Sequence, residues 1–133
     1  MLNYKIENNQ SKIDGKGAFA LQQISARKKI GNLGGEVISL REARKRVAKT
    51  NRVAMVEFGD GRALDASINA NELRYVNHSC KPNTYMRVYY SKVEFYSLRL
   101  IEKGEELTCN YGETHHEGKL KCKCGSENCK GFL

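Results

Sequence analysis

Residues 73–83 read LRYVNHSCKPN, and this stretch limits the possible folds of the chain more than any other. Between Arg74 and His78 it places a guanidinium group, an aromatic ring, a carboxamide and an imidazole. These groups offer ring stacking and directional hydrogen bonds to a ligand such as a nucleoside or an amino acid. A structural alternative is that Asn77 and His78 satisfy buried backbone polar groups in a tight crossing of two segments. From these residues alone, both interpretations stay open.

Two further segments have features that binding sites use. Residues 15–20 read GKGAFA, in which small residues let the main chain approach a ligand closely. Residues 104–112 read GEELTCNYG, a predicted strand that ends at Tyr111. A phenol at a strand end can donate a hydrogen bond and orient a nucleophile. Each segment also has an ordinary alternative, a turn for the glycines and simple packing for the tyrosine.

The five cysteines favour a metal site over disulfides. Three of them are crowded into residues 122–129, where disulfides would close very small, strained loops. Thiolate ligands for zinc in a reducing compartment fit better, and a structural zinc site needs four ligands. Cys80 and Cys109 are the two candidates for the fourth position.

Length and charge limit the broad class of the protein. A chain of 133 residues suits one hydrophobic core, and no segment resembles a secretory leader or an apolar membrane span. We therefore expect a soluble, intracellular protein with no membrane partner. The formal net charge of +8 favours an acidic partner such as DNA, RNA or a nucleosome surface, although it also serves ordinary solubility.

Short apolar runs between glycine-containing turns predict a mainly β fold. The expected strands cover residues 3–7, 18–21, 36–38, 53–58, 63–64, 84–90 and 92–101. Hairpin tips are expected at residues 59–61 and around Ser91, because glycines supply the positive φ values of tight turns. The segment 65–82 is expected to be irregular, and irregular segments often carry sites.

One helix is predicted from Ser39 to about Lys49. Ser39 and Glu42 match a capping box, in which the serine accepts from the first turn and the glutamate reaches back. The helix carries five cations: Arg41, Arg44, Lys45, Arg46 and Lys49. They form either a solvated face or a phosphate-binding surface.

Five segments, in this order, resemble the SET-domain protein lysine methyltransferases that carry a post-SET zinc motif. They are GKGAFA, GEVIS at residues 35–39, RYVNHSCKPN, GEELTCNYG and the terminal cysteine cluster. The resemblance runs from about residue 4 to the last residue. It implies several short curved sheets, one clear helix, a zinc-bound post-SET tail and a knot-like C-terminal threading beside Asn77 and His78. Residues 1–113 would form the SET domain and residues 114–133 the post-SET zinc-binding segment of one structural unit.

The resemblance also implies roles for individual residues. S-adenosylmethionine would be the methyl donor, bound by Lys16, Gly17, Arg74, Tyr75, Asn77 and His78. A structural zinc ion would be held by Cys80, Cys122, Cys124 and Cys129. Tyr111 would be the catalytic tyrosine and would line the substrate channel together with Cys109.

Three positions depart from the family pattern. Cys109 stands where relatives usually have phenylalanine or tyrosine, and its smaller side chain predicts that multiple methylation of one lysine is permitted. Leu33 and Ala54 stand where many relatives have tyrosine. The channel would be looser, or another tyrosine such as Tyr4 would substitute.

The leading functional hypothesis is methylation of a protein lysine on a histone or histone-like basic tail. The chain would then work in the nucleus or on chromatin of a eukaryote, or in a host nucleus or cytoplasm if it is viral or bacterial. A rival is a catalytically silent SET-like module that binds nucleic acid or protein through the basic helix. A third hypothesis is a thiol enzyme that uses Cys109 with His115 or His116. We expect no reader module or cysteine-rich segment to flank the domain, in which case targeting would rely on surface charge or on self-association, including a homodimer.

Overall fold

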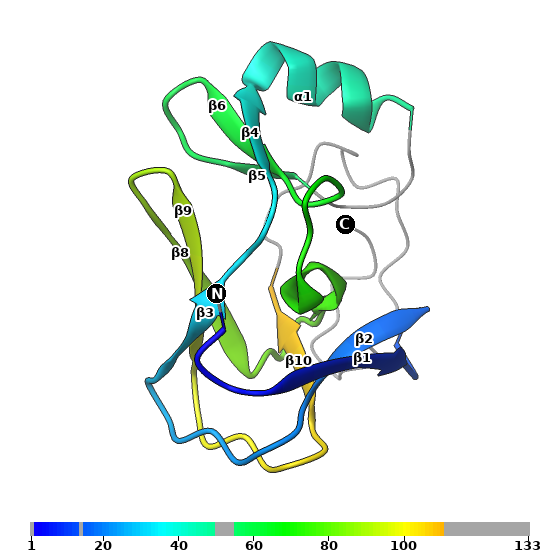
Figure 1. Cartoon of the computed structure of the whole chain (residues 1–133), viewed down its shortest axis with the longest axis vertical. Helices are drawn as coiled ribbons and strands as arrows, with labels where there is room; N and C mark the ends of the chain where they lie inside the picture. The colour runs from blue at the N-terminus through cyan, green and yellow to red at the C-terminus, as the bar shows by residue number, and fades with distance from the viewer. Residues whose placement is uncertain (1, 14, 50–54, 111–133) are drawn as a thin grey trace.

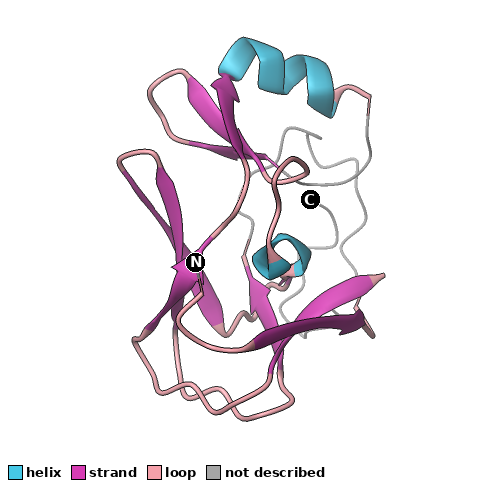
Figure 2. Cartoon of the chain, in the orientation of Figure 1, coloured by secondary structure: helices cyan, strands magenta, loops and turns pink. Residues whose placement is uncertain are grey.

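The computed structural model describes residues 2–13, 15–49 and 55–110, and this part of the chain is mainly β (Figures 1 and 2). It contains one α-helix, α1 (Leu40–Val47), and one short 3₁₀ helix, η1 (Glu72–Tyr75). The strands are β1 (Ile6–Gln10), β2 (Lys16–Ala20), β3 (Lys29–Asn32), β4 (Glu36–Ser39), β5 (Met55–Glu57), β6 (Arg62–Asp65), β7 (Asn77–His78), β8 (Thr84–Tyr89), β9 (Lys92–Ser97) and β10 (Glu106–Cys109). No helix within these ranges has the length and apolarity that crossing a bilayer requires.

The strands form two sheets, and β10 is the strand on which the larger one is organised. The larger sheet has the order β1-β2-β10-β8-β9-β3, with β7 also paired to β10, and the smaller sheet has the order β4-β6-β5. β10 pairs antiparallel with β2 and parallel with both β7 and β8. Residues of GKGAFA and RYVNHSCKPN therefore both pair with β10, which lies in the described part of GEELTCNYG. The knot-like threading and residues 114–133 lie outside what the structure describes.

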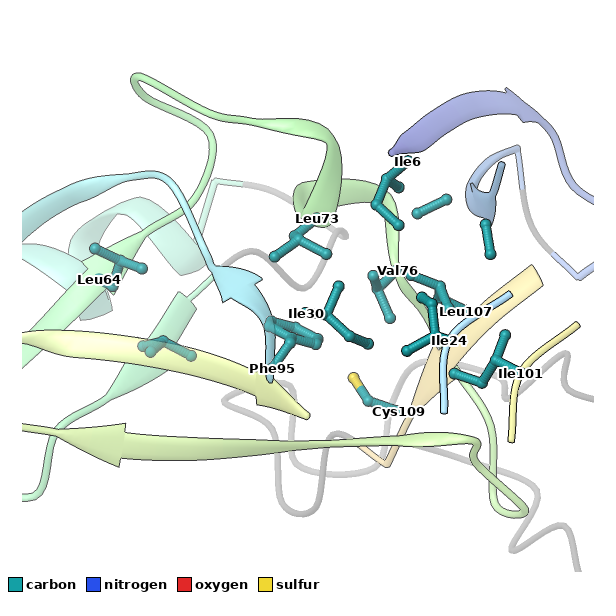
Figure 3. Close-up of a cluster of buried hydrophobic side chains, with 13 residues drawn as sticks. Ile6, Ile24, Ile30, Leu64, Leu73, Val76, Phe95, Ile101, Leu107 and Cys109 are labelled. Atoms are coloured by element: carbon teal, nitrogen blue, oxygen red, sulfur yellow. The ribbon is translucent and has the colours of Figure 1, made fainter. Parts of the chain in front are cut away.

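Side chains of the larger sheet form most of the hydrophobic core, and Leu64 of β6 and Leu73 of η1 join them (Figure 3). Its fully buried side chains include Ile24, Ile30, Val93, Ile101 and Leu107. Burying each of these contributes on the order of 1.5–3 kcal/mol. Tyr4 and Leu33 are partly buried and pack against this cluster, whereas Ala54 lies outside the described residues.

Several predicted strands are confirmed, but some begin or end at other residues than the sequence pattern predicts. β1 is displaced from the expected 3–7 because the backbone N–H of Asn3 donates to the carbonyl of Ile30 instead of joining the hairpin. β3 was missed because Gly31 interrupts its short apolar pattern. β9 ends at Ser97 instead of residue 101, since Ile101 forms an isolated bridge with Ile24.

The segment expected to be irregular contains η1 and β7. The side chain of Asn71 caps η1 by accepting from the backbone N–H of Leu73, a local signal that the sequence carried. The hairpin tip at residues 59–61 is confirmed, because Gly59 and Gly61 have φ values of 83° and 85°.

Half of the predicted capping box is present at the start of α1. The Ser39 hydroxyl accepts from the backbone N–H of Glu42 at 3.1 Å, as expected. The Glu42 carboxylate instead accepts from Arg46 Nε at 3.1 Å. Arg46 Nη1 also donates to Glu36 at 2.9 Å and to Asp65 at 2.8 Å, so one guanidinium group joins α1 to β4 and β6.

Asp65 is the buried member of this network, with 2% of its surface exposed. Burial alone would raise the pKa of its carboxyl, but hydrogen bonds from Ser67 and from Arg46 outweigh it and lower the pKa. The three carboxylates in turn raise the pKa of Arg46. α1 is thus held to the smaller sheet by charge-assisted hydrogen bonds, and it also buries Ala43 and Val47.

Replacing Asp65 by asparagine is expected to reduce the free energy of unfolding by about 1–3 kcal/mol at neutral pH, because a buried charge-assisted bond is lost. A carboxyl with a lowered folded pKa stabilises the protein above about pH 4, its unfolded value, and this contribution disappears as the pH falls through the folded value. Urea unfolding at several pH values measures it. The stability difference between wild type and Asp65→Asn should shrink in acid, and Asp60→Asn, which removes an exposed partner of Arg62, should have a smaller effect.

Candidate active site

Asn77 lies at the centre of the region where β2, β7 and β10 meet. Its carboxamide nitrogen lies 3.1 Å from the Lys16 carbonyl, 3.0 Å from a Glu106 carboxylate oxygen and 3.1 Å from the Ser11 hydroxyl. The Asn77 side chain thus donates to a backbone carbonyl, as the structural interpretation expected, but this contact is exposed and not buried, so both interpretations of Asn77 stay open. The same contacts fix its position beside Lys16 and Gly17.

An aromatic ring flanked by two cations lies next to Asn77. Lys16 Nζ is 5.5 Å and the guanidinium carbon of Arg74 is 5.1 Å from the centroid of the Tyr75 ring. Both distances are within the range of a cation–π interaction. η1 positions Arg74 and Tyr75, and both side chains are half-buried. The structure thus brings together Lys16, Arg74, Tyr75 and Asn77, four of the six residues that the resemblance assigns to the cofactor, and their role in binding stays a prediction.

Glu106 was missed by the sequence analysis, although it links three segments. Its carboxylate accepts from the Ser11 hydroxyl, at 2.9 and 2.8 Å, and from Asn77. A Cβ atom at Gly17 would clash with the Glu106 carboxylate, so a larger residue there would displace this carboxylate from Ser11 and Asn77. The alternation along β10 was the available signal, because Leu107 and Cys109 are apolar and Glu106 faces the other side.

The segment after β7 is held to β10 as well. Asn83 donates to the Glu106 carbonyl at 2.8 Å, and its side-chain oxygen accepts from the backbone N–H of Thr108 at 2.8 Å. The Asn83 side chain thus satisfies backbone groups of β10 that a neighbouring strand would otherwise pair with. They fix the position of the residues between Asn77 and Asn83.

The side chains of His78 and Cys80, which follow Asn77 in the sequence, lie close to each other. His78 is 4% exposed, and its Nε2 lies 3.4 Å from Cys80 Sγ. Within residues 2–13, 15–49 and 55–110, no three His, Cys, Asp or Glu side chains are grouped so that they could hold a metal ion. The other predicted zinc ligands, Cys122, Cys124 and Cys129, lie outside the described residues, and so does Tyr111.

Cys109 is a member of the hydrophobic core, with 1% of its surface exposed (Figure 3). Burial raises the pKa of its thiol to about 12. A thiol that stays protonated and is shielded from solvent is a poor nucleophile, which argues against the thiol-enzyme hypothesis. Its predicted place in a substrate channel stays a prediction.

Comparison with known proteins identifies relatives of this chain. A family model described as SET domain matches residues 15–112. The chain is 32% identical to histone-lysine N-methyltransferase trithorax of Drosophila virilis, over 93% of this chain and 3% of the relative. It is 32% identical to histone-lysine N-methyltransferase 2B of Homo sapiens, over 93% of this chain and 5% of the relative. It is 33% identical to histone-lysine N-methyltransferase ASHR3 of Arabidopsis thaliana, over 90% of this chain and 26% of the relative. The chain therefore spans only a small part of the length of these proteins.

Proposed function

This chain belongs to the SET-domain family, and from that premise we propose that it transfers a methyl group from S-adenosylmethionine to a lysine side chain of a histone or histone-like protein. The names of the relatives, which are histone-lysine N-methyltransferases, support the reaction class. The observation that carries the proposal is the parallel pairing of β7 with β10. It brings Asn77 and His78 beside the strand that precedes Tyr111 in the sequence.

The chemistry of the clustered side chains fits this cofactor. S-adenosylmethionine presents a carboxylate, an ammonium group, a flat adenine ring and an electrophilic methyl group on a sulfonium. Lys16 and Arg74 are the cations that suit the carboxylate, and the Tyr75 ring suits a flat aromatic group. Main-chain groups of Lys16 and Gly17, together with Asn77 and His78, complete the proposed binding set.

Methyl transfer does not require a strong acid or base among the protein's side chains. The reaction is an in-line displacement, so the main requirement is a neutral lysine amine aimed at the methyl carbon. A narrow apolar channel beside a positive sulfur lowers the pKa of the lysine and so favours the neutral amine. We assign to Tyr111 the role of orienting the lysine nitrogen through its hydroxyl group.

The zinc proposal concerns Cys80 together with Cys122, Cys124 and Cys129. Cys80 is half-buried and follows β7 by two residues. Zinc bound there would tie residues 114–133 to the segment that carries Asn77 and His78. Removing the metal would then weaken both folding and activity.

The decisive experiment incubates the protein with methyl-labelled S-adenosylmethionine and a panel of histones, nucleosomes and bacterial DNA-binding proteins. Label on a lysine of a histone or histone-like protein would support the proposal, and a histone substrate would place the enzyme on chromatin. Cofactor binding without transfer to any protein would instead favour the catalytically silent module. Sedimentation of the same sample would decide between a monomer and the homodimer considered above.

The size of Cys109 predicts how far methylation proceeds. With excess cofactor, mass spectrometry of the product should show dimethylated or trimethylated lysine, because a small side chain leaves room for a methylated amine. The Cys109→Phe variant should shift the product toward monomethyl lysine, at a cost of about 1–3 kcal/mol in stability from overpacking. Cys109→Val, which is closer in volume, should retain the wild-type product pattern. Wild-type product that stops at monomethyl lysine would contradict the prediction.

A further inference from the structure

α1 and the turn that follows it carry four exposed cations that form no ion pair within the part of the chain that the structure describes. Arg41, Arg44, Lys45 and Lys49 are all exposed, and none of them forms an ion pair with another described residue. Arg46 differs, because it is bound to Glu36, Glu42 and Asp65. Arg46 is shared by these three carboxylates and does not neutralise them all, but within the described residues none of the three forms an ion pair with Arg41, Arg44, Lys45 or Lys49. Arg46 therefore has a structural role in holding α1, whereas the other four cations have no ion-pair partner among the described residues.

The four remaining cations lie on one side of the helical turns. At about 100° per residue, residues 41, 44, 45 and 49 fall within an arc of about 140°, opposite the buried Ala43. The turn continues past Val47, because the backbone N–H of Lys49 donates to the carbonyl of Arg46. Residues 41, 45 and 49 are then spaced by about 6 Å along the axis. We call these four residues the α1 basic row.

The α1 basic row is unfavourable for an isolated helix. Like charges four residues apart destabilise a helix by a few tenths of a kcal/mol per pair. A row of phosphates at a comparable spacing would remove this repulsion and would release the counterions condensed on the nucleic acid. The net charge of +8 acts in the same direction.

We propose that the α1 basic row binds the phosphate backbone of duplex DNA without sequence preference. The row contains only cations, and the residue exposed between them is Ala48, so this face has no aromatic ring to stack on unpaired bases. It also has no carboxamide to read base edges. Phosphate contacts alone fit a regular duplex better than an unstacked single strand.

The α1 basic row is separate from the candidate active site. α1 contacts β4, β5 and β6, whereas Asn77 bonds Lys16 on β2 and Glu106 on β10, which Figure 1 shows away from α1. DNA binding is therefore independent of the proposed methyl transfer. It can be measured without cofactor or protein substrate.

The test measures the affinity for a fluorescent DNA duplex of about 20 base pairs as a function of salt concentration. The triple variant Arg41→Gln, Lys45→Gln and Lys49→Gln should reduce the slope of log K against log salt by about 2–3, since each phosphate contact contributes about 0.9. Its affinity at low salt should fall by about tenfold or more. Circular dichroism and thermal unfolding of both proteins would verify that the variant remains folded.

A matched control removes three exposed charges elsewhere, by Lys5→Gln, Lys28→Gln and Lys103→Gln. This variant should keep the wild-type salt slope to within about one unit. Equal losses in the two triple variants would overturn the proposal, because net charge alone would then explain binding. Failure of the wild type to bind the duplex, tighter binding to single-stranded DNA, or equally tight binding to polyglutamate would overturn it as well.

Discussion

Replacing Tyr111 by phenylalanine is expected to lower the rate of methyl transfer by about 100-fold or more, while S-adenosylmethionine binding changes only a few-fold. The phenol is proposed to aim the lysine nitrogen, and losing a positioned hydroxyl at a reacting centre costs about 10²–10⁴ in rate. The aromatic ring remains, so packing and cofactor affinity should be retained. Single-turnover transfer of labelled methyl groups and equilibrium binding of the cofactor measure the two effects separately.

Tyr90→Phe is the matched control for this prediction. Tyr90 lies in the turn between β8 and β9 and is 80% exposed, so removing its hydroxyl should leave transfer unchanged. A Tyr111→Phe variant with full activity would remove Tyr111 from the proposed mechanism. Parallel losses of transfer and of cofactor affinity would indicate a role in binding instead of lysine positioning.

Replacing Glu106 by alanine is expected to weaken S-adenosylmethionine binding by about tenfold or more and to lower stability by about 2 kcal/mol. The carboxylate is the acceptor shared by Ser11 and Asn77, and hydrogen bonds to a charged group contribute about 1.5–3 kcal/mol. Without it, Asn77 loses one of the contacts that hold it beside the Lys16 carbonyl. Isothermal titration with the cofactor and urea unfolding give the two quantities.

Two further variants separate positioning from general destabilisation. Glu102→Ala removes an exposed carboxylate in the turn before β10, and it should leave both quantities near the wild-type values. Gly17→Ala should imitate Glu106→Ala, because the added methyl group would occupy the position of the Glu106 oxygen. Unchanged cofactor affinity in both Glu106→Ala and Gly17→Ala would refute a role of this contact in binding.

The local elements were predictable wherever one short segment contained the whole signal. Ser39 indicated the start of α1, and the glycines at 59 and 61 indicated a hairpin tip. The same approach missed β3, where Gly31 breaks the pattern and pairing with β9 decides the outcome. It also gave only half of the capping box, because Arg46 offers Glu42 a stronger partner than the backbone does.

In the candidate site too, residues that are neighbours in the sequence were predictable, whereas residues that are distant in the sequence were not. The cluster of Arg74, Tyr75 and Asn77 was predictable because these residues are neighbours in the sequence. Glu106 was not, since its partners Ser11 and Asn77 are 95 and 29 residues away and meet it only through pairing with β10. The roles of Tyr111 and of the terminal cysteines rest on family resemblance and stay predictions.

The central position of β10 also determines when the binding site can exist during synthesis. Residues 16–20 and 77–78 leave the ribosome early, but both need residues 106–109 as a sheet partner. Closing such long loops is entropically costly and slow, so this strand joins late in folding. A nascent chain therefore carries an incomplete candidate site until residues 106–109 have emerged from the ribosome.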